Sequence, residues 1–153
     1  VTSASNALIT LAVFTIVTLS FFTLGGQPPG VAEVALYAAY VTAALLIVVG
    51  ISLGGSVLFL RYRDLNQIWE VITQAGFFVA PIVYPLGILP ERFHFYLYLW
   101  PPTAIIQFSR DVLVAHRVPT LRAHMLLAAM TVGILAGGMA LYRRYAPRAA
   151  EYL

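Results

Sequence analysis

Few side chains in this sequence have the types and spacing that chemistry requires. The three histidines, His94, His116 and His124, lack the His-Glu-x-x-His spacing of a zinc site, and there is no cysteine to complete a metal centre. A phosphate-binding loop ends in Lys-Ser or Lys-Thr, and the chain contains no lysine. The sequence therefore predicts no catalytic residues, no metal, no cofactor bound by this chain and no ATP hydrolysis by the chain alone.

Composition favours a membrane protein. The chain is 61% hydrophobic and only 10% charged, with a mean hydropathy of +0.87. A soluble domain of this length could not bury so much apolar surface, whereas a bilayer solvates it. All basic residues are arginines near the ends of apolar runs, which is typical of membrane anchors and not of a nucleic-acid-binding patch. Membrane lipid is thus an expected partner, and nucleic acid is not.

Four apolar runs are long enough to cross a bilayer, for which about 20 residues are needed. They predict helices because only helices satisfy the backbone within such segments. Their bounds are about 7–24, 34–60, 68–89 and 125–142. We therefore expect an all-α, polytopic membrane helical bundle that forms a single domain over residues 1–153. Because the chain starts at Val1 and carries no charge before Glu33, unlike a signal peptide, we expect it to be N-terminally truncated.

A fifth apolar run, Phe93 to Ser109, is interrupted by Pro101 and Pro102. Each half is too short to cross, so we predict a re-entrant hairpin of two half-helices over about 90–115, on the outer side of the membrane. Aromatic residues crowd this segment, either as an interface belt or as a surface that stacks on sugar rings. They are Phe93, Phe95, Tyr96, Tyr98, Trp100 and Phe108.

The distribution of arginine predicts the orientation of the chain. Loop 61–67 and the C-terminal tail together carry five arginines, and the opposite side carries four. Cytoplasmic loops are enriched in Lys and Arg, so the C-terminus is expected in the cytoplasm.

Small residues and prolines mark further positions in the spans. Gly50-x-x-x-Gly54 and Gly133-x-x-x-Gly137 let helices approach closely, either as ordinary packing or as a subunit or gate contact. Pro81 is expected to kink the third span, either as a static bend or as part of a gate.

Two charged clusters lie beside the apolar runs. Arg61, Arg63 and Asp64 are either a membrane anchor, with Arg61 and Asp64 paired, or a hinge that responds to a cytoplasmic partner. Arg110 and Asp111 lie where the hairpin leaves the membrane, and we expect them to neutralise each other or to anchor the segment at the interface.

An ordered series of short strings covers roughly residues 45–153. The strings are LRYRD at 60–64, FFVAPIVYP at 77–85, ILP at 88–90, WPPTAII at 100–106 with Arg110, and YAPRAAEYL at 145–153. In this order and spacing the chain resembles type-2 ABC transporter permeases, in particular the group that exports O-antigen, teichoic acid and capsule polysaccharides. It differs from them at Ala80, where serine is usual, and at 100–102, where Asn-Pro is usual.

The resemblance implies the last four spans of a six-span permease in the bacterial inner membrane. It implies a homodimer, two ATPase subunits that hold ATP and Mg, and a lipid-linked glycan as substrate. The residues then expected at the substrate pathway or gate are Phe77, Phe78, Pro81, Tyr84, Pro85, Trp100, Pro101, Pro102 and Arg110. The expected cytoplasmic hinge is Arg61, Arg63 and Asp64.

Two other functions remain open from the sequence. One is a type-2 ABC permease for drug or lipid export, which a neighbouring resistance gene cluster would favour over glycosyltransferase neighbours. The other is a membrane scaffold without transport, which would not co-purify with an ATPase.

Overall fold

The computed structural model describes residues 29–62, 64–82, 84 and 86–149, together with isolated helical positions between 9 and 25. Within these residues every regular element is helical, as the sequence predicted, and there is no strand. The elements are α2 (Val31–Arg61), α3 (Leu65–Val79), the 3₁₀ helix η1 (Leu86–Ile88), α4 (Glu91–Tyr98), α5 (Pro101–Leu113) and α6 (Leu121–Ala149). Ten of the 18 residues of the predicted span at 7–24 are described, and all ten are helical.

Two of the described helices, α2 and α6, are long and apolar enough to cross a membrane. Their apolar stretches are Val31–Phe59 and Leu121–Pro147, somewhat longer than the predicted second and fourth spans. Only 17% of the most apolar window of each helix is buried inside the chain. The core helix of a soluble protein would be mostly buried, so these exposed apolar faces are weak evidence that the protein lies in a membrane.

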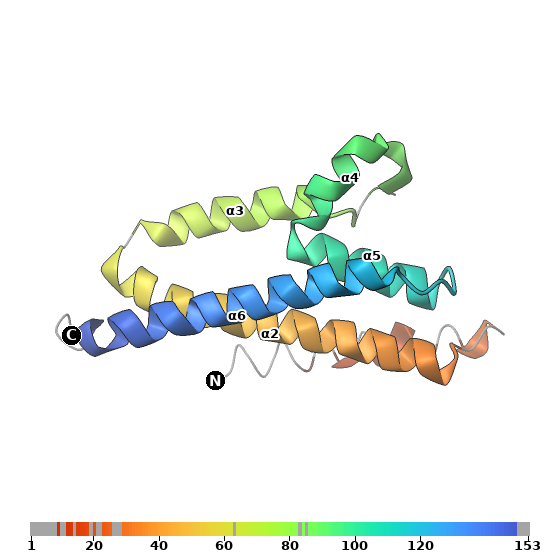
Figure 1. Cartoon of the computed structure of the whole chain (residues 1–153), viewed down its shortest axis with the longest axis horizontal. Helices are drawn as coiled ribbons and strands as arrows, with labels where there is room; N and C mark the ends of the chain where they lie inside the picture. Colours follow the sequence, from red (N-terminus) through yellow and green to blue (C-terminus); the bar gives the residue numbers. More distant parts are fainter. Residues whose placement is uncertain are drawn as a thin grey trace.

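These two helices run side by side in the same direction (Figure 1). Glycine sets their closest approach: a Cβ on Gly50 would lie 2.8 Å from the Cα of Leu135, and one on Gly138 would overlap the Gly50 carbonyl oxygen. Gly50 and Gly54 thus allow the two helices to pack closely, which is the first of the two roles predicted for this pair. The prediction for Gly133 and Gly137 is wrong for this contact, because a Cβ on either would meet nothing within 4 Å.

Helix α3 is shorter than the sequence predicted. It has 15 residues and ends at Val79, whereas a single kinked span over 68–89 was expected. Ala80 is extended, with ψ 133°, because the ring of a following proline disfavours the helical conformation. At about 1.5 Å per residue, α3 is roughly 22 Å long and falls short of a bilayer core of about 30 Å.

The apolar run that the prolines interrupt forms two short helices, as predicted. Helix α4 has 8 residues and α5 has 13, and the chain turns between them at Leu99 and Trp100. Pro101 and Pro102 occupy the first turn of α5, where a missing N–H costs no hydrogen bond. Helix α5 packs against α2 and α6, and the core residues lie along this contact. They are Tyr40, Ala104, Phe108, Val112 and Leu127.

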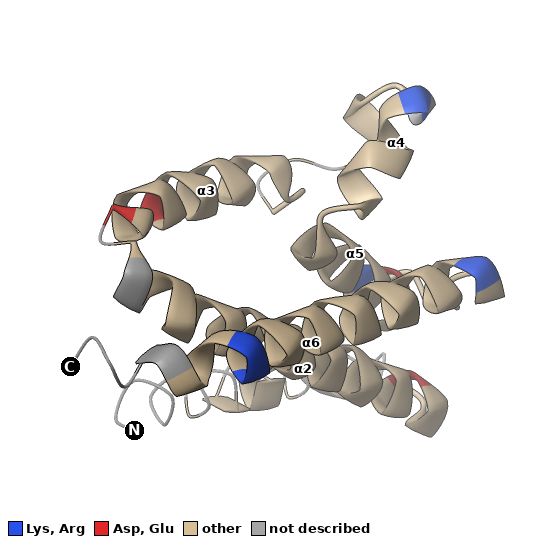
Figure 2. Cartoon of the chain, turned by 60° about the vertical axis from the view of Figure 1, so that its left-hand side comes forward, with Lys and Arg blue, Asp and Glu red and all other residues tan. Residues whose placement is uncertain are grey.

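Charged residues lie near the ends of the helices (Figure 2). No charge occurs in α2 between Glu33 and Arg61, or in α6 between Arg122 and Arg143. Because α2 and α6 are parallel, the turn after α2 and the end of α6 lie at the same end of the bundle (Figure 1). The start of α6 and the end of α5 lie at the opposite end.

Candidate functional site at the junction of α3 and the short-helix pair

The turn between α4 and α5 contacts α3 through one tryptophan. The indole of Trp100 packs directly on the backbone of Gly76, so closely that a Cβ on Gly76 would overlap the Cζ2 atom and lie 3.0 Å from Cε2. Gly76 is buried and lies within the last turn of α3, since its carbonyl accepts the N–H of Ala80 at 2.9 Å. The contact therefore fixes the short-helix pair against the end of α3.

The chain reverses tightly just after this contact. The Ile82 N–H donates to the Ala80 carbonyl at 2.7 Å, and the Tyr84 hydroxyl donates back to the Val79 carbonyl at 3.0 Å. Pro81 is less than 2% exposed, so its ring fills the inside of this reversal. Pro81 thus ends α3 and does not kink a continuous helix.

Other predicted pathway residues surround the junction without meeting at one point. Phe77 and Phe78 are 48% and 74% exposed, and their rings meet edge to face at a centroid distance of 5.8 Å. Pro101 is half-buried and Pro102 is exposed. Pro85 lies outside the described residues.

Arg110 does not belong to this junction. It lies in the last turn of α5, nine residues beyond Pro101 and hence roughly 13 Å along the helix. The predicted neutralisation of Arg110 by Asp111 is not found, because adjacent helical residues do not face each other. Asp111 instead accepts a hydrogen bond from the Gln107 amide at 2.9 Å.

A polar and aromatic cluster beyond the junction joins α2, α5 and α6. The Tyr40 hydroxyl lies 2.8 Å from His124 Nε2, and His124 Nδ1 lies 3.1 Å from the Thr120 carbonyl. Because that carbonyl can only accept, Nδ1 carries the proton and Nε2 accepts from Tyr40. The Phe108 ring stacks on Tyr98 and on His124, with centroid distances of 5.8 Å and 6.0 Å.

Tyr98 brings a second hydroxyl to this cluster. Burial, and secondarily the Asp111 carboxylate, raise the pKa of Tyr98 above its ordinary value. The hydroxyl therefore stays protonated and able to donate near neutral pH.

Two polar atoms on the same face of α5 are buried without a partner: the Thr103 hydroxyl and the Gln107 side-chain oxygen. Thr103, Gln107 and Asp111 are four residues apart, so they form a polar row along the helix. A buried unpaired hydroxyl or amide costs free energy, about 1–3 kcal/mol per group. The row is thus unusual for a helix that packs mainly through apolar side chains.

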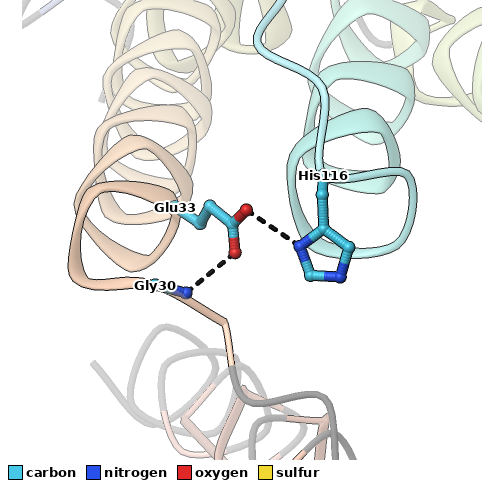
Figure 3. A network of polar contacts seen from close by, with 3 residues as sticks. All are labelled: Gly30, Glu33 and His116. Atoms are coloured by element: carbon cyan, nitrogen blue, oxygen red, sulfur yellow. Dashed lines mark hydrogen bonds and ion pairs between the residues drawn. The ribbon is translucent and has the colours of Figure 1, made fainter.

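The far end of the bundle is closed by a contact between Glu33 and His116. Glu33 accepts from the Gly30 N–H at 2.8 Å and from His116 Nδ1 at 2.8 Å (Figure 3). His116 has a φ of 49°, a left-handed conformation that is uncommon for a non-glycine residue. Among the described side chains this is the only contact that becomes an ion pair when its histidine is protonated, and it links the start of α2 to the loop after α5.

The predicted cytoplasmic hinge is only partly described. Asp64 is exposed and its carbonyl accepts the N–H groups of Gln67 and Ile68 at the start of α3. Arg63 and the Arg61 side chain lie outside the described residues, so the expected pair between Arg61 and Asp64 does as well. The turn between α2 and α3 is short, with the Leu65 N–H donating to the Tyr62 carbonyl at 3.1 Å.

Sequence reasoning identified Trp100 and Pro81 but missed their neighbours. Gly76 could be read only as a residue that loosens the stretch around Pro81, because its contact depends on Trp100, a residue 24 positions away. The histidines were considered only as metal ligands, whereas His124 and His116 make hydrogen bonds to α2. Among the described residues no group of three His, Asp or Glu side chains could hold a metal ion.

Replacing Pro81 tests the helix end. In Pro81→Ala, residue 80 regains helical freedom and residue 81 regains an N–H, so α3 is expected to extend past Ala80. Membrane insertion should be unchanged because alanine is apolar and favours helices, and the lost ring should cost about 1 kcal/mol. For an exporter of the family that the sequence resembles, this change should slow substrate export several-fold, measured at the cell surface and normalised to protein abundance.

Pro90→Ala is the matched control, since Pro90 is exposed and caps the start of α4 only through its backbone carbonyl, which alanine retains. Normal export by Pro81→Ala at normal abundance would mean that the helix end contributes to packing alone.

Comparison with known proteins adds no assignment: no protein-family model, curated protein or solved structure matches the chain.

Proposed function

We propose that the chain is the membrane-spanning permease part of an ATP-driven type-2 ABC exporter that moves a lipid-linked polysaccharide across the bacterial inner membrane. The observation that carries the proposal is the arrangement around Trp100: two long apolar helices with exposed faces, and a shorter helix that ends where a pair of short helices packs on it. The strings that resemble these permeases fall on the breaks of this arrangement, at 60–64, 77–85 and 100–106.

The helix directions support a multi-pass topology. Parallel α2 and α6 require the intervening chain to return to its starting side, and α3 with the short-helix pair makes that return. The turn after α2 and the C-terminus then share the cytoplasmic side, which also fits the distribution of arginine. The α4–α5 pair belongs on the outer side in this proposal, as a re-entrant hairpin.

Exposed apolar side chains on α3 indicate that this helix packs against further lipid or protein. Ile68, Val71 and Phe78 are each more than half exposed, and a helix this apolar needs lipid or protein around it. A second copy of the permease is proposed for this role, as in the family that the sequence resembles. The ATPase subunit, with its ATP and Mg, is proposed at the cytoplasmic end near the turn after α2.

The exposed aromatic rings of α4 support a sugar-containing substrate, because aromatic rings stack on sugar faces. Among the exposed rings of α4 are Phe95 and Tyr96, which are 61% and 68% exposed. These groups lie on the side where the glycan would leave the membrane.

Reconstitution tests the proposed division of labour. The full-length permease in proteoliposomes is expected to hydrolyse no ATP by itself, because the chain has no phosphate-binding loop. With its cognate ATPase it should support ATP-dependent movement of lipid-linked glycan, measured by accessibility of the sugar to a membrane-impermeant lectin. An ATPase with its catalytic glutamate replaced is the control for passive leakage.

Two outcomes would favour the other functions that the sequence left open, and a third would contradict the proposed roles of permease and ATPase. Transport of drugs or phospholipids without glycan movement would support the other type-2 exporters. Failure to co-purify with any ATPase would support a scaffold. ATP hydrolysis by the purified permease alone would contradict the proposed separation of subunits.

A further inference from the structure

A groove of about 350 Å³ lies where the first turns of α3 approach α2 and α6. Its lining includes Gly54 and Gly55 of α2, Gly137 of α6, and Trp69 of α3. The remaining lining residues are glycine or apolar, so the indole N–H of Trp69 is the one polar side-chain group among the lining residues. A groove lined in this way favours apolar ligands over polar ones.

The position of the groove along α2 and α6 limits which kind of molecule can occupy it. Its residues on α2 begin at Gly50 and those on α6 begin at Ile134, which are in the second halves of both apolar stretches. In a membrane this part of each helix faces hydrocarbon, and the mobile apolar molecule there is a lipid acyl chain. A tryptophan on the wall also fits, because tryptophan prefers the level where chains meet headgroups.

An arginine beside the groove indicates the kind of headgroup that the lipid carries. Leu141 is the last residue of α6 in the groove, and Arg144 follows three positions later on the same face, about 4.5 Å further along the axis. Arg144 is exposed, and its guanidinium lies 5.8 Å from the centre of the Tyr145 ring. A cation at the end of an apolar groove matches the phosphate of an anionic lipid.

We infer that this groove binds one acyl chain of an anionic phospholipid whose phosphate contacts Arg144. The inference rests on the proposed membrane position of the chain and is independent of what the exporter carries. A lipid in this place fills the space between α3 and the α2–α6 pair at the end of the bundle opposite the polar cluster. It thereby supports α3 where that helix has few contacts with the rest of the chain.

Glycine substitutions test the apolar part of the site. A Cβ on Gly137 meets nothing within 4 Å, so the leucine of Gly137→Leu enters the groove without a backbone clash. Gly133 is one turn away, equally open and outside the lining, so Gly133→Leu is the matched control for helix propensity. Delipidated full-length permease would be titrated with phosphatidylglycerol and followed by native mass spectrometry.

We expect one phospholipid per chain to survive in the wild type. Gly137→Leu should lower its affinity by about tenfold or more, because the leucine takes the place of several methylene groups, while Gly133→Leu should leave it unchanged. Equal affinities in the two variants, whether both retained or both lost, would overturn the inference. So would a cross-link from Trp69 to a second copy or to a helix other than α2 and α6.

Arginine substitutions test the headgroup and remain informative if a groove variant misfolds. In Arg144→Gln, the affinity for phosphatidylglycerol should fall to the affinity for phosphatidylcholine with the same acyl chains. Arg143 lies on the face of α6 opposite the groove, so Arg143→Gln should leave the affinity for phosphatidylglycerol unchanged. Inorganic phosphate should not compete, since the acyl chain supplies most of the affinity. An unchanged preference for phosphatidylglycerol in Arg144→Gln would exclude this contact. Because the assay needs neither ATPase nor glycan, its result is separate from that of the export test.

Discussion

Gly138→Ala should strongly destabilise the protein. A Cβ at this position would overlap the carbonyl oxygen of Gly50. The Cβ is attached directly to the backbone of one long helix, and the oxygen belongs to the backbone of the other. Backbones cannot turn aside as side chains do, so α2 and α6 would have to separate along their whole contact. We expect the free energy of unfolding to fall by about 3 kcal/mol, at the upper end for an overpacked core. Thermal or denaturant unfolding of the purified protein in detergent measures this.

Gly137→Ala is the matched control for this loss. It makes the same chemical change one residue earlier, where a Cβ meets nothing within 4 Å. Alanine also favours helix over glycine by about 1 kcal/mol, so Gly137→Ala should be neutral or slightly stabilising. Equal unfolding midpoints for the two variants would mean that α2 and α6 do not approach through Gly138.

Gly76→Leu should have the largest effect on export. The leucine occupies the place of the Trp100 indole, so α3 and the short-helix pair must separate or shift. Overpacking of this kind costs about 1–3 kcal/mol, which lowers the equilibrium constant for forming the native junction by roughly 5- to 150-fold. We expect export of the proposed substrate to fall several-fold or more, measured at the cell surface and normalised to protein abundance.

Two further variants isolate the contact. Gly87→Leu is the control, because Gly87 is exposed and a Cβ there meets nothing within 4 Å. The double variant Gly76→Leu with Trp100→Ala removes the clash and should recover part of the export that Gly76→Leu loses. A double variant no better than the single one would show that the loss arises away from this contact.

Helix type and approximate position followed from local sequence. The apolar runs at 34–60 and 125–142 reach the range of roughly 17–25 residues that a bilayer requires, and both became long helices. The division of residues 90–115 into two helices also followed locally, because Pro101 and Pro102 can begin a helix but cannot continue one. These features depend on residues within a few turns of each other, so a single sequence suffices to predict them.

The end of α3 shows where local reasoning was incomplete. Pro81 was expected to kink a helix that continued to residue 89, whereas the helix ends at Val79. A proline permits both results, and the choice depends on whether the chain beyond it has contacts that favour leaving the helix. Here the burial of Pro81 and the hydrogen bond from Tyr84 to Val79 stabilise the reversal.

Contacts between distant helices were decided by the tertiary structure alone. The sequence contains glycine pairs in both long helices, but which glycine faces the neighbour depends on the rotation of each helix about its axis. Gly138 lies only 100° around α6 from Gly137, and the packing of the whole helix selects one over the other. The same holds for Gly76 with Trp100 and for Tyr40 with His124, since each partner is identified only after the helices have packed.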